Sequence, residues 1–274
     1  AVDKPPASWI WLFGPEVLER YRRIPSQPPS FTSCMLPDAQ YIVMRTGWSN
    51  GDRYLLFDCA PWGGGHSHDD RLQVILYAGR DLLIDPGIYS YDQPLSRTYF
   101  RTSAAHNVLL IDGDKQLRAD PEVVCWATND VVDFAAGQIA AGGLRQLRSV
   151  MMLKPDYWVV VDHVFGEGRH DISRLFHFPL CQVRADRSSV RTAFEEGTNL
   201  LVRCLDGARI TVEDGWIPTG GATAEKGPVA RMRSEVSLPA VFAVVLVPFR
   251  RSEEIPQIQR LAAADPLTVH LQVS

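Results

Sequence analysis

Three residues of metal-binding type, His68, Asp85 and His106, follow one another at intervals of 17 and 21 residues. Two neutral imidazoles and one carboxylate are a common ligand set for zinc, and they leave a fourth position open. Asp85 ends an apolar run just before Pro86-Gly87, a place where a buried carboxylate needs a partner. His106 opens a later apolar run. Metal binding would satisfy all three polar groups, so the pattern predicts a metal site.

A second histidine, His66, shares a glycine-rich loop with His68. Glycines at positions 63 to 65 allow the positive φ angles that a tightly folded loop requires. An isolated His-x-His can equally be a polar surface turn, and the loop by itself leaves both interpretations open. Zinc is favoured over calcium as the metal, because calcium prefers sites made only of oxygen ligands.

Arginines and tyrosines are concentrated between Asp85 and His106. A guanidinium matches two oxygens of a carboxylate or sulfate group, and a tyrosine can exchange a proton with a sugar oxygen. An acidic glycan is therefore the expected ligand, although such residues are often only surface cover. His177 alternates with apolar neighbours and is either a structural histidine or a wall of the same cavity. The arginines and tyrosines of the segment are Tyr89, Tyr91, Arg97, Tyr99 and Arg101.

Composition restricts the class of protein. Of the 274 residues, 46% are hydrophobic and 22% are charged, as in a chain that buries a substantial core. The formal net charge of −4 argues against a generally basic nucleic-acid binder, and no apolar run approaches the roughly 20 residues of a membrane span. The five cysteines are widely spaced without a Cys-x-x-Cys motif, so Cys59 and Cys204 are expected in the core rather than on a metal.

Short strands and turns follow one another from Phe31 onward. Asn50-Gly51 favours a hairpin between 41–45 and 54–58, and a second hairpin is expected between 72–77 and 82–85. Many short strands without long helices predict an all-β fold of packed antiparallel sheets, a large β-sandwich. Further strands are expected at 106–111, 144–153, 157–161, 171–178, 198–205, 208–214, 229–237, 240–247 and 267–273.

Residues 1–30 differ from the rest. Prolines bracket 16–23, which could form a short helix, so this part is expected to be a linker or the tail of a preceding helical element. Residues 31–274 are predicted to form the β-domain. The chain has no Gly-x-Ser-x-Gly motif and no phosphate-binding glycine loop.

Several ordered motifs occur along the chain. They are Val43-Met-Arg45-Thr-Gly-Trp48, Gly65-His-Ser-His-Asp69, Leu83-Ile-Asp85-Pro-Gly87, Tyr99-Phe-Arg101-Thr-Ser-Ala-Ala-His106-Asn107, Val161-Asp162 and Phe176-His-Phe178-Pro. With these motifs the chain resembles the C-terminal half of the heparinase II/III-like polysaccharide lyases, a family that includes the oligoalginate lyases. The resemblance runs from about Phe31 and is most specific between His66 and Asn107.

This resemblance implies a large antiparallel β-sandwich that normally follows an N-terminal α/α toroid. It implies zinc on His68, Asp85 and His106, and a cleft in which His66 binds or neutralises a uronate. Such lyases cleave acidic polysaccharides by β-elimination, in which a base removes the C5 proton and an acid protonates the departing O4. The family's other proton-transfer residues come largely from the toroid. The chain is therefore expected to be the C-terminal part of a longer lyase, without a complete active site of its own.

The leading hypothesis is the sandwich domain of an acidic-polysaccharide lyase. The metal would mainly fix the loop that carries His66, because elimination requires no activated water. A non-catalytic domain that binds anionic glycans or forms an interface is the main alternative, and a metal-dependent hydrolase or cupin-like oxygenase is a weaker one. A periplasmic or secreted location and a homodimer are further expectations from the resemblance. The candidate catalytic residues are His66 and Tyr99, and the candidate substrate contacts are Arg97, Arg101, Tyr89 and His177.

Overall fold

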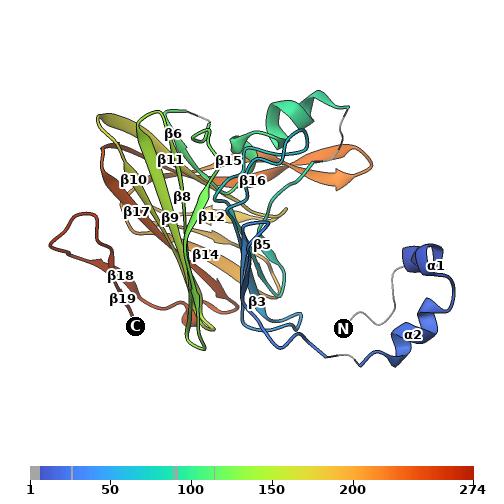
Figure 1. Ribbon diagram of the computed structural model, residues 1–274. Coiled ribbons are helices and arrows are strands. Elements are labelled where there is room, and N and C mark those ends of the chain that lie inside the picture. Colours follow the sequence, from blue (N-terminus) through green and yellow to red (C-terminus); the bar gives the residue numbers. More distant parts are fainter. Residues whose placement is uncertain (1–6, 26, 89, 91, 114) are drawn as a thin grey trace.

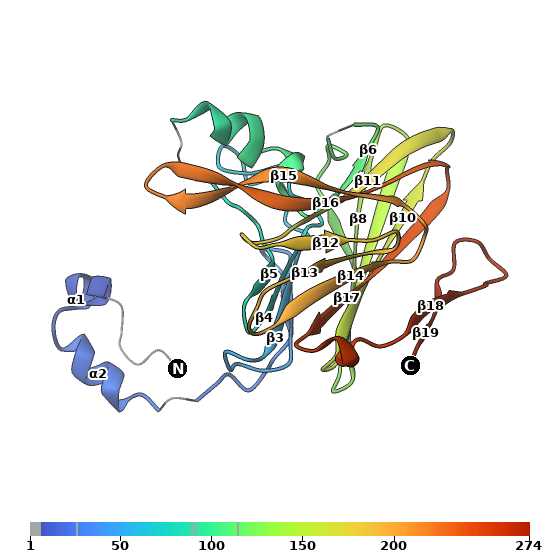
Figure 2. The same ribbon diagram turned by 180° about the vertical axis from the view of Figure 1, so that it is seen from behind.

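The computed structural model describes residues 7–274 except 26, 89, 91 and 114. Two short helices, α1 (Ala7–Phe13) and α2 (Val17–Arg23), come first and lie apart from the sheets in both ribbon views (Figure 1, Figure 2). The predicted helix at 16–23 is confirmed as α2, whereas α1 was not predicted. The apolar side chains of α1 are largely exposed, and Trp11 is 90% exposed.

The main regular elements of the rest of the described chain are antiparallel strands, which form four sheets. The first sheet has the order β1-β2-β3-β4-β5, with β1 (Cys34–Leu36), β2 (Tyr41–Arg45), β3 (Arg53–Asp58), β4 (Val74–Ala78) and β5 (Asp81–Leu83). The second has the order β12-β13-β14-β17-β10-β9-β8-β7, with β7 (Glu122–Thr128), β8 (Val132–Ala141), β9 (Leu144–Leu153), β10 (Tyr157–Phe165), β12 (Val183–Ala185), β13 (Ser189–Thr192), β14 (Asn199–Cys204) and β17 (Ala240–Phe249).

Two smaller sheets complete the domain. The third has the order β15-β16-β11-β6, with β6 (Leu109–Ile111), β11 (Arg169–His177), β15 (Arg209–Gly220) and β16 (Thr223–Ser237). The fourth pairs β18 (Ile258–Leu261) with β19 (His270–Val273). Part of β15 and β16 extends beyond the body of the domain as a long two-stranded ribbon (Figure 2).

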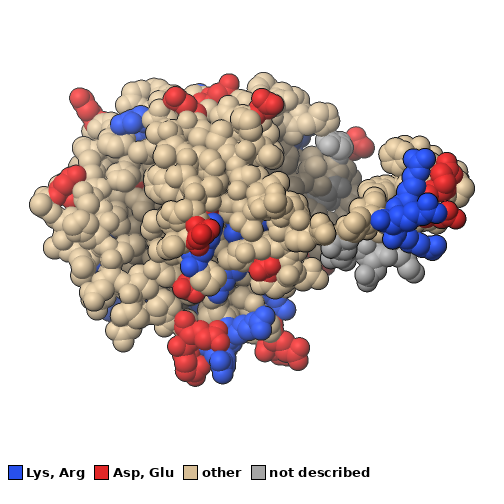
Figure 3. Space-filling view, turned by 60° about the horizontal axis from the view of Figure 1, so that its bottom comes forward, with Lys and Arg blue, Asp and Glu red and all other residues tan. Residues whose placement is uncertain are grey.

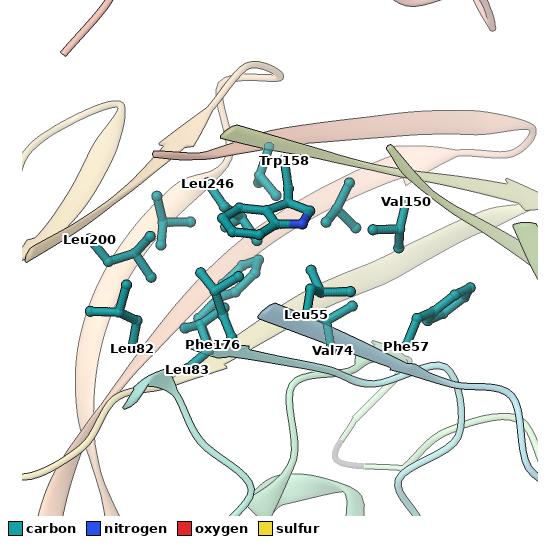
Figure 4. Packing of buried hydrophobic residues seen from close by; sticks show 14 of the residues in the cluster. Leu55, Phe57, Val74, Leu82, Leu83, Val150, Trp158, Phe176, Leu200 and Leu246 are labelled. Carbon is teal, nitrogen blue, oxygen red and sulfur yellow. The ribbon is translucent and has the colours of Figure 1, made fainter. Parts of the chain in front are cut away.

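The main core lies between the five-stranded and eight-stranded sheets. Figure 4 shows Trp158 of β10 across this core from Leu55 of β3 and Val74 of β4. These side chains are at most 1% exposed, because alternate residues of each strand point to the inner face. Cys59 and Cys204 are buried in the same core, as predicted, and all five cysteines are free thiols. The predicted β-sandwich is confirmed.

The hairpin β7–β8 was not predicted. Strand β7 is an exposed edge strand, and β8 is rich in alanine, so neither has the alternation of large apolar residues that indicates a strand. Small residues are required in β8, because a Cβ atom on Gly137 would lie 2.5 Å from the Sγ atom of Cys59 and 2.8 Å from Leu72. The β8 backbone thus supports the segment between β3 and β4 from behind.

Other predicted strands differ mainly in length. The strand predicted at 267–273 is shorter in the structure, where it is β19. The strands predicted at 208–214 and 229–237 are longer, as β15 and β16. Figure 3 shows charged side chains scattered over the visible face, with denser groups of both signs at the lower edge and on the projecting helical arm. None of the described helices is long and apolar enough to cross a membrane.

Candidate functional site

The structure brings His68, Asp85 and His106 together. His68 lies in the loop between β3 and β4, Asp85 lies two residues after the end of β5, and His106 follows a short 3-10 helix (Ser103–Ala105) before β6. One potential ligand atom from each residue lies within 4.8 Å of the others, and His106 is fully buried. The Nδ1 atom of His106 is 3.1 Å from Oδ2 of Asp85. The predicted ligand set is therefore one cluster, assembled from three separate ends of elements.

Two buried amides hold this cluster in place, and neither was singled out from the sequence. Gln73 donates from Nε2 to Oδ2 of Asp85 at 2.7 Å. Asn107 donates from Nδ2 to the carbonyl oxygens of Val74 (2.8 Å) and Ile84 (2.9 Å), and its Oδ1 accepts the His177 N–H at 2.6 Å. Partners of this kind fix the orientation of metal ligands. The only sequence signal for Asn107 was its position next to His106.

The pKa directions favour an ionised Asp85 and a neutral His68, whereas His106 favours a proton that a metal ion would have to displace. Burial alone would raise the pKa of Asp85, but hydrogen bonding to His106 and the His106 charge hold that pKa well below its usual range. Burial alone would lower the pKa of His106, and the bond to Asp85 raises it instead. Burial and the charge of His106 lower the pKa of His68. An ionised carboxylate and a neutral imidazole are the protonation states that metal binding requires.

Arg101 fixes the loop that carries His66. Its guanidinium donates to the carbonyl oxygens of Gly65 (2.6 Å) and Ser67 (3.1 Å from Nη2), while its own carbonyl oxygen accepts the Asp69 N–H at 3.1 Å. Gly64 has a φ of +86°, as expected for a tightly folded glycine loop. Arg101 was predicted to contact substrate, and in this structure most of its donors hold the loop.

Two hollows border this loop. His66 and His68 line a cavity of about 550 Å³ together with Trp62. Arg97 and Arg101 line a second cavity of about 640 Å³. The structure therefore places the predicted His66 and the predicted arginines on neighbouring cavities rather than in one.

The predicted residue Tyr99 packs against a neighbouring strand. It lies in a short π-helical turn (Ser96–Phe100), and its hydroxyl packs against Gly215 of β15. Burial raises the pKa of Tyr99. Tyr99 is not among the described residues that line the two cavities, so its contact with a glycan stays a prediction.

His177 takes the structural alternative of the two that its sequence pattern left open. It is 4% exposed, and its Nε2 atom is 2.9 Å from the carbonyl oxygen of Ala104. Burial and the charge of His106 lower its pKa to about 3, which keeps the ring neutral. In this position it supports the segment before His106. It lines neither of the two cavities, so its contact with substrate stays a prediction. The candidates Tyr89 and Tyr91 lie outside the described residues.

Asp58 gives the first cavity a pH-dependent contribution to stability. Burial, with the charges of Asp70 and Asp85, raises the pKa of Asp58 from 3.8 to about 7. A carboxyl group with a raised pKa contributes most to stability when the pH is below its pKa in the unfolded chain. This contribution is lost as the pH rises through its pKa in the folded chain. The free energy of unfolding of Asp58→Asn, relative to that of the wild type, should therefore increase by on the order of 2–4 kcal/mol when the pH is raised from about 5 to about 8.

Urea unfolding at both pH values measures this change. Asp38→Asn, at an exposed position of the same cavity, is the matched control. A stability difference between Asp58→Asn and the wild type that is the same at both pH values would contradict the raised pKa.

Comparisons with known proteins agree with this architecture. The family model described as "Heparinase II/III-like, C-terminal" matches residues 28–259. The curated heparin-sulfate lyase of Pedobacter heparinus is 22% identical over 222 residues, covering 76% of this chain and 33% of that protein. The heparin-sulfate lyase of Bacteroides stercoris is 22% identical over 246 residues, covering 84% and 36%. The chain thus spans about a third of the length of these curated relatives.

Solved structures show the same fold. The heparan sulfate lyase HepC from Pedobacter heparinus superposes with a TM-score of 0.82 at 21% identity, covering 97% of this chain and 45% of that chain. A heparinase III superposes with a TM-score of 0.85 at 19% identity, covering 97% and 44%. At these identities the likeness establishes the shared β-sandwich and nothing further.

Proposed function

Because the chain belongs to the heparinase II/III-like C-terminal family, we propose that it is the β-sandwich domain of a longer lyase that cleaves a uronic-acid-containing polysaccharide by β-elimination. The names of the matched relatives support a glycosaminoglycan of the heparan type as substrate. The share of those relatives that the chain spans supports a longer parent protein.

One observation carries this proposal. The loop with His66 is fixed by the His68 cluster on one side and by Arg101 on the other, so that it borders both a histidine-lined and an arginine-lined cavity. β-Elimination places growing negative charge on the uronate carboxylate as the C5 proton leaves. Prearranged positive groups that meet this charge supply a large part of the rate acceleration. His66 and the arginines would contribute that charge to one wall of the cleft.

The donor set fits a metal ion, which His68, Asp85 and His106 would hold. Two imidazoles and one carboxylate favour zinc over calcium. When bound, the ion would supply a fixed positive charge that ties the His66 loop to β5 and to the segment before β6. Gln73 would orient the Asp85 carboxylate, and burial would keep His68 neutral.

A non-catalytic domain that binds anionic glycans is the second candidate. The observation that favours it is the packing of the Tyr99 hydroxyl against Gly215, because it leaves the His66 wall without this tyrosine as a proton-transfer partner. Under this alternative the parent protein would bind an acidic glycan without cleaving it.

The lyase assay separates the two candidates. The parent protein should convert heparan sulfate to products with ultraviolet absorbance, which arises from the new C4=C5 double bond conjugated to the carboxylate. His66→Ala should lower this rate by about 100-fold or more, because the variant loses the imidazole that binds or neutralises the uronate carboxylate as negative charge grows on it. His270→Ala, at an exposed position on β19, is the matched control and should retain the wild-type rate. Saturable binding without any absorbance change would favour the binding domain.

A further inference from the structure

We propose that the arginine-lined cavity beside the His66 loop is the subsite for one anionic group of the glycan, a uronate carboxylate or a sulfo group. This inference rests on the proposed function and extends it to two residues without an assigned role, Arg71 and Arg118. It also makes Asp69 a competitor of the ligand for these arginines.

The charges of the cavity support an anionic ligand. Arg71, Arg97, Arg101 and Arg118 line it together with only two aspartates, so the lining has an excess of positive charge in a chain with a net charge of −4. A cleft lined mainly by one sign of charge concentrates ligands of the opposite sign. An anionic sugar substituent is therefore attracted to this cavity.

The neighbouring cavity has the opposite character. It is lined by Asp38, Asp58 and Asp70, with Arg71 as its one arginine among the described residues. Trp62 and Arg71 line both cavities, so these side chains mark the boundary between them. The higher density of arginines assigns one anionic group of the glycan to the cavity with Arg97, Arg101 and Arg118, next to the His66 wall.

Arg71 provides an independent indication of a missing anion. Its side chain is only 9% exposed, and its one ion pair with a described residue joins Nη1 to Oδ1 of Asp69 at 3.2 Å. Its Nε atom is buried and has no hydrogen-bond partner. A buried cation with unsatisfied donors is costly unless a further anion or acceptor compensates it. A carboxylate or sulfo group in the cavity would supply acceptor oxygens.

Asp69 is shared between two arginines. Besides Arg71, it meets Arg118, whose Nη2 atom lies 3.8 Å from Oδ2 of Asp69 and whose side chain is 74% exposed. Such a long and exposed ion pair contributes little to stability. Arg118 can therefore turn to a ligand at small cost. Arg97 is also exposed, whereas Arg101 is held by the loop carbonyls.

Removing the two exposed arginines tests the subsite. Arg97→Ala and Arg118→Ala should each weaken binding of heparan sulfate to the 274-residue chain by about tenfold, because each removes a charge-assisted fork for an anionic oxygen pair. Arg187→Ala removes the same charge at an exposed turn outside this cavity and should bind like the wild type. Asp69→Asn should tighten binding, because it frees Arg71 and Arg118 from their shared carboxylate.

Calorimetry with two probes identifies the anionic group. Heparan sulfate carries carboxylate and sulfo groups, and its chemically desulfated form carries only carboxylates. If Arg97→Ala and Arg118→Ala lose the same affinity for both probes, the subsite binds the carboxylate. If they lose affinity only for the sulfated probe, the subsite binds the sulfo group. If Arg97→Ala and Arg118→Ala bind both probes like Arg187→Ala, the subsite is overturned while the proposed function stands. If the wild type binds neither probe and the parent protein has no lyase activity, both are overturned.

Discussion

The purified chain should hold about one zinc ion, and both His68→Ala and Asp85→Ala should release it, because each variant loses one of three protein ligands. Plasma mass spectrometry on the protein after dialysis against buffer without metal measures the stoichiometry. The loss of metal should be nearly complete in both variants.

Two further variants sharpen this test. His270→Ala removes a histidine that lies outside the cluster and should keep its zinc. Gln73→Ala should keep the three ligands but weaken metal binding by about 10- to 100-fold, because it removes a hydrogen bond that orients Asp85. A folded wild-type chain that takes up no zinc even when zinc is supplied would refute the metal site.

The structural role of the metal can be tested separately. If the ion fixes the His66 loop, chelation should increase proteolysis at the glycines between Trp62 and His66. A chelator that changes lyase activity while the loop stays protected would contradict this role.

The second large effect concerns the buried ion pair between Arg148 of β9 and Asp162 of β10. Asp162→Ala should lower the free energy of unfolding by about 3–5 kcal/mol, because it leaves a buried guanidinium without its counter-charge. The pair is bidentate, with Nε–Oδ1 at 2.8 Å and Nη2–Oδ2 at 2.9 Å, and both side chains are 3% exposed. Gln146 donates a further hydrogen bond to Asp162 at 2.9 Å.

This pair also supports the candidate site. Arg148 donates from Nη1 to the carbonyl oxygens of Leu72 (2.8 Å) and Asn107 (2.9 Å), which lie next in sequence to Gln73 and His106. Loss of Asp162 should therefore weaken metal binding as well as stability.

Urea unfolding of a matched pair of variants tests this prediction. Glu235→Ala breaks the exposed ion pair with Arg169, whose side chains are 70% and 59% exposed, and should cost less than about 1 kcal/mol. The double variant Arg148→Met/Asp162→Leu should regain much of the lost stability, because it removes both charges together. Equal destabilisation by Asp162→Ala and Glu235→Ala would contradict the argument.

The sequence by itself determined the fold class, and it predicted the three residues that the structure brings together, His68, Asp85 and His106. Zinc on these residues stays a prediction. The alternation of apolar and polar residues in segments such as 267–273 indicates which face of a strand is buried. This pattern depends only on neighbouring residues, so it can be recognised in the sequence. Asp85 and His106 could be recognised because each is a polar residue at the edge of an apolar run. His68 was recognisable because the glycines before it indicate a folded loop.

Only the tertiary structure decided which residues surround these ligands. Gln73 bonds directly to Asp85, and Asn107 bonds to Val74 of β4 and His177 of β11. The Arg148–Asp162 pair supports the cluster from the other sheet. Such partners have no fixed spacing from the ligands, because they depend on how strands far apart in the sequence pack together. The sequence therefore contains no local pattern that identifies them.

The tertiary structure also decided which predicted residues face a cavity. Arg97 and Arg101 line one, whereas Tyr99 packs against β15 and His177 is buried under the His106 segment. The side-chain chemistry of these four residues suits glycan binding equally well. Gly215 of β15 meets the Tyr99 hydroxyl, Ala104 bonds to His177, and the carbonyl oxygens of Gly65 and Ser67 hold Arg101. These contacts are a property of the folded chain alone.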